Sequence, residues 1–271
     1  MQVISVPGGE MAYRTQGAGE PVVLVHGTPS SSHEWRYIVP ALAERYRVLA
    51  PDHLGFGASS RPPDFRVYTL RWHTENLRAW LEALKLPRFH LVVHDFGGPV
   101  ALPLALEQPD RIQSLTIIQS WLWDLRAPKS MGGPLMRWLY LSLNFSPRVM
   151  VPLSWGRRVP LTRELRREFL AQFPNRAARA GAFGFARSIA FERPLLDELS
   201  QRLGVLSDIP TLVVWGLADK IVRPENLARW RSALPSAAVL ELPDVGHFPQ
   251  LEAPDEIAPA IARHLEGSHR R

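Results

Sequence analysis

Cysteine is missing from the whole chain of 271 residues. Its absence excludes disulfide bonds, metal sites built on thiolates and catalysis by a cysteine nucleophile. The sequence also lacks any apolar run of the roughly 18–20 residues that a membrane-spanning helix needs. Near the N-terminus there is no basic start followed by an apolar core and a cleavage site. We therefore expect a cytoplasmic protein without a membrane partner.

Signatures of nucleic-acid binding are missing as well, although the formal net charge is +6. There is no zinc-finger spacing, no aromatic RNA-binding motif and no basic heptad repeat. The charge is uneven, because residues 122–205 hold 14 Lys or Arg against 6 Asp or Glu, a difference of +8 that leaves −2 for the rest. We interpret this excess as a solvated helical surface, with attraction of anions as the alternative, and expect no nucleic-acid partner.

Apolar runs alternate with stretches of helical periodicity along most of the chain. The runs typical of strands are 3–6, 11–15, 22–25, 47–50, 89–93, 115–118, 211–215 and 238–242. Helical spacing follows at 70–84, before Pro87, and again at 101–107 and 256–265. Alternating strands and helices predict a mainly parallel sheet with helices on both faces. The first two runs lie so close in sequence that we expect a hairpin there.

The alternation stops after Ile118 and returns at Thr211. Residues 122–205 contain Trp, Arg, Pro and helix-like stretches but no convincing strand. An insertion of this size between two strands of one sheet predicts a helical cap. We therefore predict a core domain of residues 1–121 and 206–271 with a helical cap of residues 122–205.

A buried strand delivers a charged residue to a glycine-rich turn in LVVHDFGGP, residues 91–99. The segment VHDFG has the layout of the strand–nucleophile–helix turn G-x-S-x-G, with Asp95 in place of serine and Val93 in place of the first glycine. Such a turn holds the nucleophile at the carboxyl end of its strand, close to the positive end of the next helix. Taken alone, the motif fits a helix-capping aspartate equally well.

The segment HGTPSSSHEWR, residues 26–36, favours the nucleophile, because it follows another predicted strand. Its His-Gly turn can place the amide of Thr28 opposite the amide of Phe96, so that the two form an oxyanion hole.

Two segments near the end of the chain complete the pattern. WGLADKIVRP places Asp219 just after a strand, and DVGHFPQLEAP places His247 between the last strand and the last helix. The chain order nucleophile, acid, histidine is that of an α/β-hydrolase triad. We therefore predict Asp95, Asp219 and His247 as the catalytic residues.

These motifs resemble those of the α/β-hydrolase superfamily, and within it those of the haloalkane dehalogenases and epoxide hydrolases. HGTPSSSHEWR is similar to the dehalogenase block HGxPTxSxxWR, PDHLGFGASSRP to PDxxGFGxSxKP, LVVHDFGG to LVVxDWGG, and GHFPQ to GHFxQ. The resemblance covers nearly the whole chain outside the predicted cap. It implies an α/β-hydrolase fold, with a mainly parallel eight-stranded sheet, flanking helices and an inserted helical cap.

The resemblance also gives the aspartate a chemical reason. A serine that attacks an alkyl halide or an epoxide leaves an ether, which water does not readily cleave, whereas a carboxylate leaves an ester. We expect Asp95 to become alkylated and His247, oriented by Asp219, to activate the water that hydrolyses the ester. A small-molecule substrate and water are then the expected partners, the oligomeric state stays open, and no cofactor or metal is expected.

The leaving group separates the two substrate classes. A halide needs N–H donors, often indoles, whereas an epoxide needs a proton donor, commonly two cap tyrosines. Four tryptophans lie between Trp121 and Trp155 and Tyr140 is the cap's single tyrosine, which favours halide release. The candidate substrate- or halide-binding residues are Trp35, Trp121, Trp123 and Tyr140.

The chain departs from the dehalogenase pattern at two positions. Phe96 stands where dehalogenases usually carry Trp, and Thr28 stands where many carry Asn. We expect cleavage of carbon–halogen bonds, with epoxide hydrolysis by the same triad as the alternative. A catalytically silent protein that binds small molecules is the alternative of another class.

Overall fold

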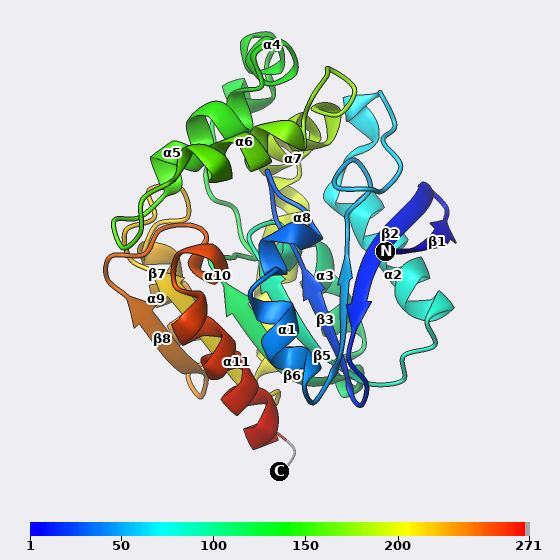
Figure 1. The fold of residues 1–271 in the computed structure, drawn as a ribbon, viewed down its shortest axis with the longest axis vertical. Coiled ribbons are helices and arrows are strands. Elements are labelled where there is room, and N and C mark those ends of the chain that lie inside the picture. Colours follow the sequence, from blue (N-terminus) through cyan, green and yellow to red (C-terminus); the bar gives the residue numbers. More distant parts are fainter. Residues whose placement is uncertain (269–271) are drawn as a thin grey trace.

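A single sheet of eight strands forms the centre of the computed structural model, which describes residues 1–268. Figure 1 shows the sheet between two layers of helices. The strand order is β1-β2-β4-β3-β5-β6-β7-β8. β2 runs antiparallel to both of its neighbours, and all other neighbouring strands are parallel. The strands are β1 (Gln2–Val6), β2 (Gly9–Gln16), β3 (Pro21–Val25), β4 (Arg47–Pro51), β5 (Phe89–His94), β6 (Ile112–Ile118), β7 (Thr211–Gly216) and β8 (Ala238–Leu242).

Helices cover both faces of the sheet because the central strands are apolar on both sides. In β3, Val22 and Leu24 pack on one face with α1 and α11, whereas Val23 and Val25 pack on the other with α2, α3 and α9. The helices of the core are α1 (Ile38–Ala43), α2 (Leu70–Ala83), α3 (Gly97–Glu107), α9 (Glu225–Ala233), α10 (Pro249–Glu252) and α11 (Pro254–Ser268).

All eight predicted strands are confirmed, as is the hairpin of the first two. The helix expected from residue 101 begins four residues earlier, at Gly97. Its first turn escaped prediction because glycine and proline, which fill residues 97–99, are poor helix formers.

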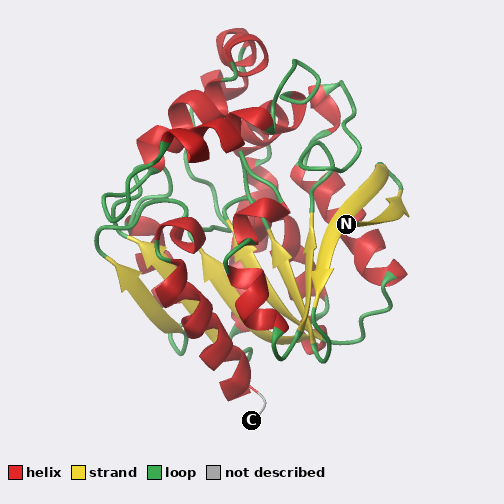
Figure 2. Ribbon diagram, in the orientation of Figure 1, coloured by secondary structure: helices red, strands yellow, loops and turns green. Residues whose placement is uncertain are grey.

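Residues 122–205 contain helices and turns but no strand. Figures 1 and 2 show α4 to α7 gathered beyond one end of the sheet, at the top of the view. The end of this segment returns to the core, where the turn Leu203–Leu206 contacts α3. The helices are α4 (Pro134–Leu143), α5 (Val151–Ser154), α6 (Arg163–Ala171), α7 (Ala180–Phe191) and α8 (Arg193–Gln201). Within residues 1–268, no helix has the length and apolar character to cross a membrane.

Candidate active site

The turn after β5 holds Asp95 in a strained backbone conformation at the carboxyl end of the sheet. Its φ of +49° lies in the left-handed region, which non-glycine residues seldom adopt. Gly97 lets α3 begin directly behind this turn, since a Cβ there would lie 2.2 Å from the carbonyl oxygen of Val25. The backbone carbonyl of Asp95 accepts a hydrogen bond from Ser120 Oγ at 2.6 Å. The packing around the turn therefore maintains a conformation that Asp95 would not adopt by itself.

The two carboxylate oxygens of Asp95 have different surroundings. Oδ2 accepts a hydrogen bond from the backbone N–H of Thr28 at 2.8 Å, whereas Oδ1 lies 3.5 Å from His247 Nε2. Burial raises the pKa of Asp95, but the hydrogen bond and charge of His247 outweigh it, with smaller contributions from His94 and Thr28, so the pKa lies below its ordinary value. Asp95 is therefore a buried, ionised carboxylate with one oxygen held and the other facing His247.

His247 is oriented by the carboxylate of Asp219. Its Nδ1–H donates to Asp219 Oδ2 at 2.7 Å, which leaves Nε2 directed at Asp95. Burial lowers the pKa of His247, but the charges and hydrogen bonds of Asp219 and Asp95 raise it more, so that it lies well above its ordinary value. The structure thus brings together the three residues that the sequence singles out, in the order carboxylate, imidazole, carboxylate.

The loop that carries His247 is anchored through its backbone. The N–H of His247 donates to the carbonyl of Ser154 at 2.9 Å, and its carbonyl accepts from His94 Nε2 at 2.7 Å. The buried Glu252 carboxylate accepts from the backbone N–H groups of Gly156, Gly246 and Phe248. Since Ser154 and Gly156 belong to the inserted segment, the loop is tied to the insertion as well as to the sheet.

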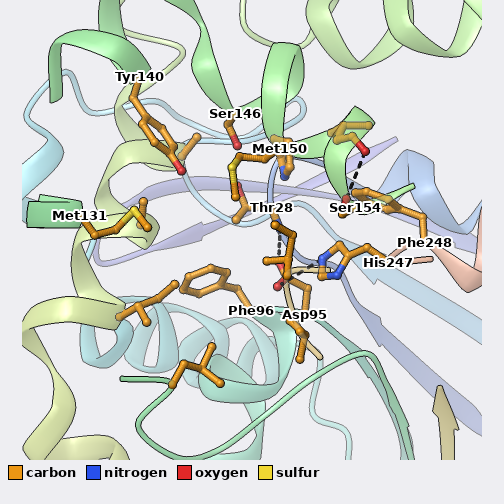
Figure 3. A pocket seen from close by; sticks show the side chains of 18 of the residues that line it. Thr28, Asp95, Phe96, Met131, Tyr140, Ser146, Met150, Ser154, His247 and Phe248 are labelled. Carbon is orange, nitrogen blue, oxygen red and sulfur yellow. Dashed lines mark hydrogen bonds and ion pairs between the residues drawn. The ribbon is translucent and has the colours of Figure 1, made fainter. Parts of the chain in front are cut away.

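An apolar cavity of about 100 Å³ lies over Asp95. Figure 3 shows Asp95, Phe96 and His247 on one side, with Met131, Tyr140, Ser146 and Met150 of the inserted segment across from them. Further lining residues are Thr28, Pro29, Trp121, Leu125, Val151, Ser154, Ala182, Ala186, Ile189, Ile221, Val222 and Phe248. Most of these side chains are hydrocarbon, so the carboxylate of Asp95 faces a surface that offers water few partners.

The four candidate substrate-binding residues divide into two pairs. Trp121 and Tyr140 line the cavity. Trp35 and Trp123 do not, so the cavity gives no support to the expectation that they bind substrate. Trp35 is fully buried beneath the His94 ring, on the α1 side of the sheet. The indole N–H of Trp123 donates to Asn226 Oδ1 at 2.7 Å, so the Trp123 ring is directed toward α9.

Gln119 is a site residue that the sequence did not single out. Its Nε2 donates to Asp219 Oδ2 at 2.6 Å, and its Oε1 accepts from the backbone N–H of Gly216 at 2.7 Å. Like Asp95, it follows a central strand with a positive φ, of 44°. A polar residue at the carboxyl end of a buried strand was the available signal. Within residues 1–268 no group of three or more His, Asp or Glu side chains is arranged to hold a metal ion.

The chain is similar to known proteins in sequence and in fold. Residues 20–254 match the model of a family described as alpha/beta hydrolase fold. The chain is 34% identical over 261 residues to haloalkane dehalogenase 2 of Mycobacterium tuberculosis, covering 93% of this chain and 90% of that protein. It is 32% identical to the cis-3-alkyl-4-alkyloxetan-2-one decarboxylase of Shewanella oneidensis, covering 97% of this chain and 87% of that protein.

Among solved structures, the haloalkane dehalogenase DbeA from Bradyrhizobium elkani superimposes with a TM-score of 0.87 at 25% identity. The superposition covers 99% of this chain and 98% of that one. The resemblance drawn from the motifs, and the fold that it implies, are thereby confirmed.

Proposed function

The chain belongs to the α/β-hydrolase fold family, and from this premise we propose that it is a hydrolase that uses Asp95 as its nucleophile to remove halide from small haloalkanes. The observation that carries the proposal is a carboxylate at the nucleophile turn that borders an apolar cavity. Its free oxygen lies 3.5 Å from Nε2 of His247, whose other ring nitrogen is held by Asp219. Esterases carry serine at the same turn, where this chain has Asp95. Alkylation of a carboxylate gives an ester, which water can cleave.

In the first step, Asp95 Oδ1 attacks the carbon that bears the halogen. The new bond joins Oδ1 to this carbon while the carbon–halogen bond breaks and the halide departs with the electron pair. Oδ2 stays on the Thr28 amide and becomes the carbonyl oxygen of the ester. The low pKa of Asp95 keeps the nucleophile ionised in the free enzyme.

In the second step, His247 Nε2 takes a proton from a water that attacks Cγ of the ester. The oxyanion forms on Oδ2, where the amides of Thr28 and Phe96 stabilise it, each by about 3 kcal/mol. The alcohol then leaves with the proton from His247. Esterification removes the Asp95 charge that helps raise the pKa of His247, so the alkylated state favours the neutral imidazole that a base requires.

The departing halide needs donors, and the cavity provides two. The Nε1–H of Trp121 and the hydroxyl of Thr28 are buried in its lining without a hydrogen-bond partner among the described residues. A buried donor without a partner is costly unless a ligand supplies the acceptor. Both groups are therefore candidates to stabilise halide in place of the indole that Phe96 does not provide.

Epoxide opening is the second candidate, and Tyr140 is the observation that favours it. Its hydroxyl faces the cavity from the side opposite Asp95 (Figure 3), and burial raises its pKa, so the phenol keeps the proton that an alkoxide would need. Both reactions require that residues 122–205 act as a cap that keeps bulk water away from Asp95. Six cavity residues between Met131 and Ser154 support this role.

The two-step scheme is tested by removing the base. His247→Phe should attack a substrate once, release one leaving group and remain as an ester on Asp95. After incubation with 1-bromobutane, intact-protein mass spectrometry should detect a protein heavier by a butyl group. An epoxide, or the oxetan-2-one that the Shewanella relative is named for, should instead add its whole mass. The same spectrum therefore distinguishes ring opening from halide displacement.

Two variants serve as controls. Asp95→Asn should form no adduct, because a carboxamide is a poor nucleophile. His264→Phe, in α11 and outside the cavity, should turn over substrate without accumulating an adduct. If good substrates of all three classes leave His247→Phe unmodified, the aspartate-nucleophile mechanism is wrong and a binding role becomes the better account.

A further inference from the structure

A second carboxylate–histidine pair lies directly behind the predicted triad. Glu34, in the 3-10 turn Ser32–Trp35, faces His94 Nδ1 with its Oε1 at 2.9 Å. Both side chains have no exposed surface. The centres of the His94 and His247 rings are 5.1 Å apart. An ionisable pair that is fully buried beside a catalytic histidine calls for a functional explanation, because such groups are costly to remove from water.

The contacts of His94 define where its protons lie. Nε2 is 2.7 Å from the backbone carbonyl of His247, which can only accept, so Nε2 carries a proton and donates it. Nδ1 faces a carboxylate, so a second proton lies between Nδ1 and Oε1 of Glu34. The neutral tautomer with its proton on Nδ1 alone would leave the His247 carbonyl without its donor. The charge of Glu34 therefore favours a His94 ring that carries both protons, which holds His247 and is positively charged.

We propose that Glu34 and His94 are positioning residues for the reaction proposed above. Glu34 holds a second proton on the His94 ring, at Nδ1, and so maintains positive charge beside Asp95. His94 fixes the backbone of the base through its Nε2–H. The proposal rests on the proposed function for its kinetic consequences. Its structural part rests on the two hydrogen bonds alone. His94 touches no substrate, since it does not line the cavity.

The groups that face His94 come from four parts of the chain. Glu34 approaches from the turn Ser32–Trp35, Asp95 follows it in sequence, and His247 lies across from it with Asp219 behind. Glu252 of α10 holds the flanking amides of the His247 loop. The His94 charge is among the causes that lower the pKa of Asp95, after burial and His247. Losing that charge should therefore make Asp95 easier to protonate.

One oxygen of Glu34 supports a role beyond packing. Oε2 is buried without a hydrogen-bond partner among the described residues, although a carboxylate oxygen in such a place costs stability. A glutamate selected only for folding would be expected to have both oxygens satisfied. Glu34→Gln keeps the shape and should therefore fold.

The first measurement concerns protons and needs no substrate. In protein labelled with ¹⁵N-histidine, NMR should show protonated Nε2 and Nδ1 on His94, with the signals assigned by their loss in His94→Gln. Glu34→Gln should leave Nε2 protonated and remove the proton from Nδ1. An unprotonated Nε2 in the wild-type protein overturns the proposal, and so does an Nδ1 signal that Glu34→Gln leaves unchanged. Because this measurement is independent of turnover, it decides on the pair even where the reaction is a different one.

The second measurement separates position from charge. His94→Leu should slow hydrolysis of the ester about 10- to 100-fold, because the base is displaced. Glu34→Gln leaves Nε2 of His94 protonated, so it should change this step much less. His94→Gln retains a donor for the His247 carbonyl, so its hydrolysis rate should recover toward that of the wild type. All three variants should move the acid limb of the alkylation rate to higher pH, since none retains the positive ring beside Asp95. Rapid-quench measurement of halide release and of alcohol release reports the two steps.

Glu20, which precedes β3, provides the control through a histidine on the same strand as His94. It lies near His90 at the other end of β5, with 3.5 Å between its Oε2 and His90 Nε2. Glu20→Gln changes the same chemistry far from Asp95 and should leave both rates and the pH profile unchanged. If Glu34→Gln behaves like Glu20→Gln in turnover and in pH profile, Glu34 has a structural role only and the proposal is overturned.

Discussion

Trp121 and Trp123 lie two residues apart, yet their indole N–H groups have opposite surroundings. Trp121 lines the cavity with Nε1 unpaired among the described residues, whereas Trp123 donates to Asn226. Trp121→Phe should therefore slow halide release about 100-fold in kcat/KM. The free energy of unfolding of this variant should stay within about 1 kcal/mol of the wild-type value, because no hydrogen bond within the protein is lost. Halide assays and urea unfolding measure the two effects.

Trp123→Phe is the matched control and should give the reverse pattern. Losing the bond to Asn226 should cost about 1 kcal/mol of stability and leave the rate of alkylation unchanged. Equal rates in the two variants would exclude Trp121 as the halide donor.

The pH dependence of the first step is set by the partner of Asp95. His247 is the main cause that lowers the pKa of Asp95, and burial opposes it. Replacing His247 by Phe leaves burial, so the pKa of Asp95 should rise. As pH falls, the single-turnover rate of His247→Phe should therefore decline at a higher pH than the alkylation rate of the wild type. Stopped-flow halide release across the acid range measures both, and coincident acid limbs would contradict the assigned charge coupling.

At the residue scale, motifs predicted those residues whose type and position in the chain together indicate a role in catalysis. Asp95, Asp219 and His247 each follow a strand of the sheet, and parallel strands bring such positions to one edge. Their catalytic roles stay predictions. Gln119 and Glu34 escaped because their roles arise from contacts across the fold. Trp35, a candidate for substrate binding, lies outside the cavity because it packs on the opposite face of the sheet.

At the scale of elements, the start of α3 depends on Gly97. A Cβ there would meet the Val25 carbonyl at 2.2 Å, so the helix would have to move away from β3. Gly97→Ala should lower the free energy of unfolding by about 2–4 kcal/mol and reduce activity, because the turn that strains Asp95 would relax. Thermal unfolding and a halide assay measure the loss.

Gly204 provides the comparison for this substitution. A Cβ there would meet no atom within 4 Å, so Gly204→Ala should keep both stability and activity. Equal stability of the two alanine variants would mean that β3 and α3 are less tightly packed than their geometry indicates.

Periodicity predicted the strands well, because most of them are short, largely apolar runs between turns. It predicted the insertion only as a segment without strands. The bounds of the individual helices α4 to α8 were not predicted, because they depend on tertiary packing. Apolar residues of these helices face both the cavity and the core, so no single apolar face marks them in the sequence. The domain boundary at residue 205 stays a prediction. The turn Leu203–Leu206 already packs on α3, so the passage from insertion to core is gradual.

At the scale of the whole molecule, the cavity between the insertion and the sheet limits which substrates fit. Its volume of about 100 Å³ is smaller than the roughly 150 Å³ that accommodates benzene in an engineered protein core. Substrates with a few heavy atoms should therefore reach Asp95 without displacing helices of the insertion. Residues 122–205 also carry the +8 excess, which under the proposed function would attract the halide product.

The preferred chain length follows from this volume. In a series from bromoethane to bromooctane, kcat/KM should be highest for the short chains and fall for longer ones. Ile189→Ala, which shortens a residue of the cavity wall in α7, should move the optimum to a longer chain by creating space for additional methylene groups. Ile4→Ala, in β1 at the edge of the sheet, removes the same atoms far from the cavity and should leave the optimum unchanged. An optimum that stays fixed in Ile189→Ala would mean that the insertion moves to admit substrate, and that the closed cavity does not set the selectivity.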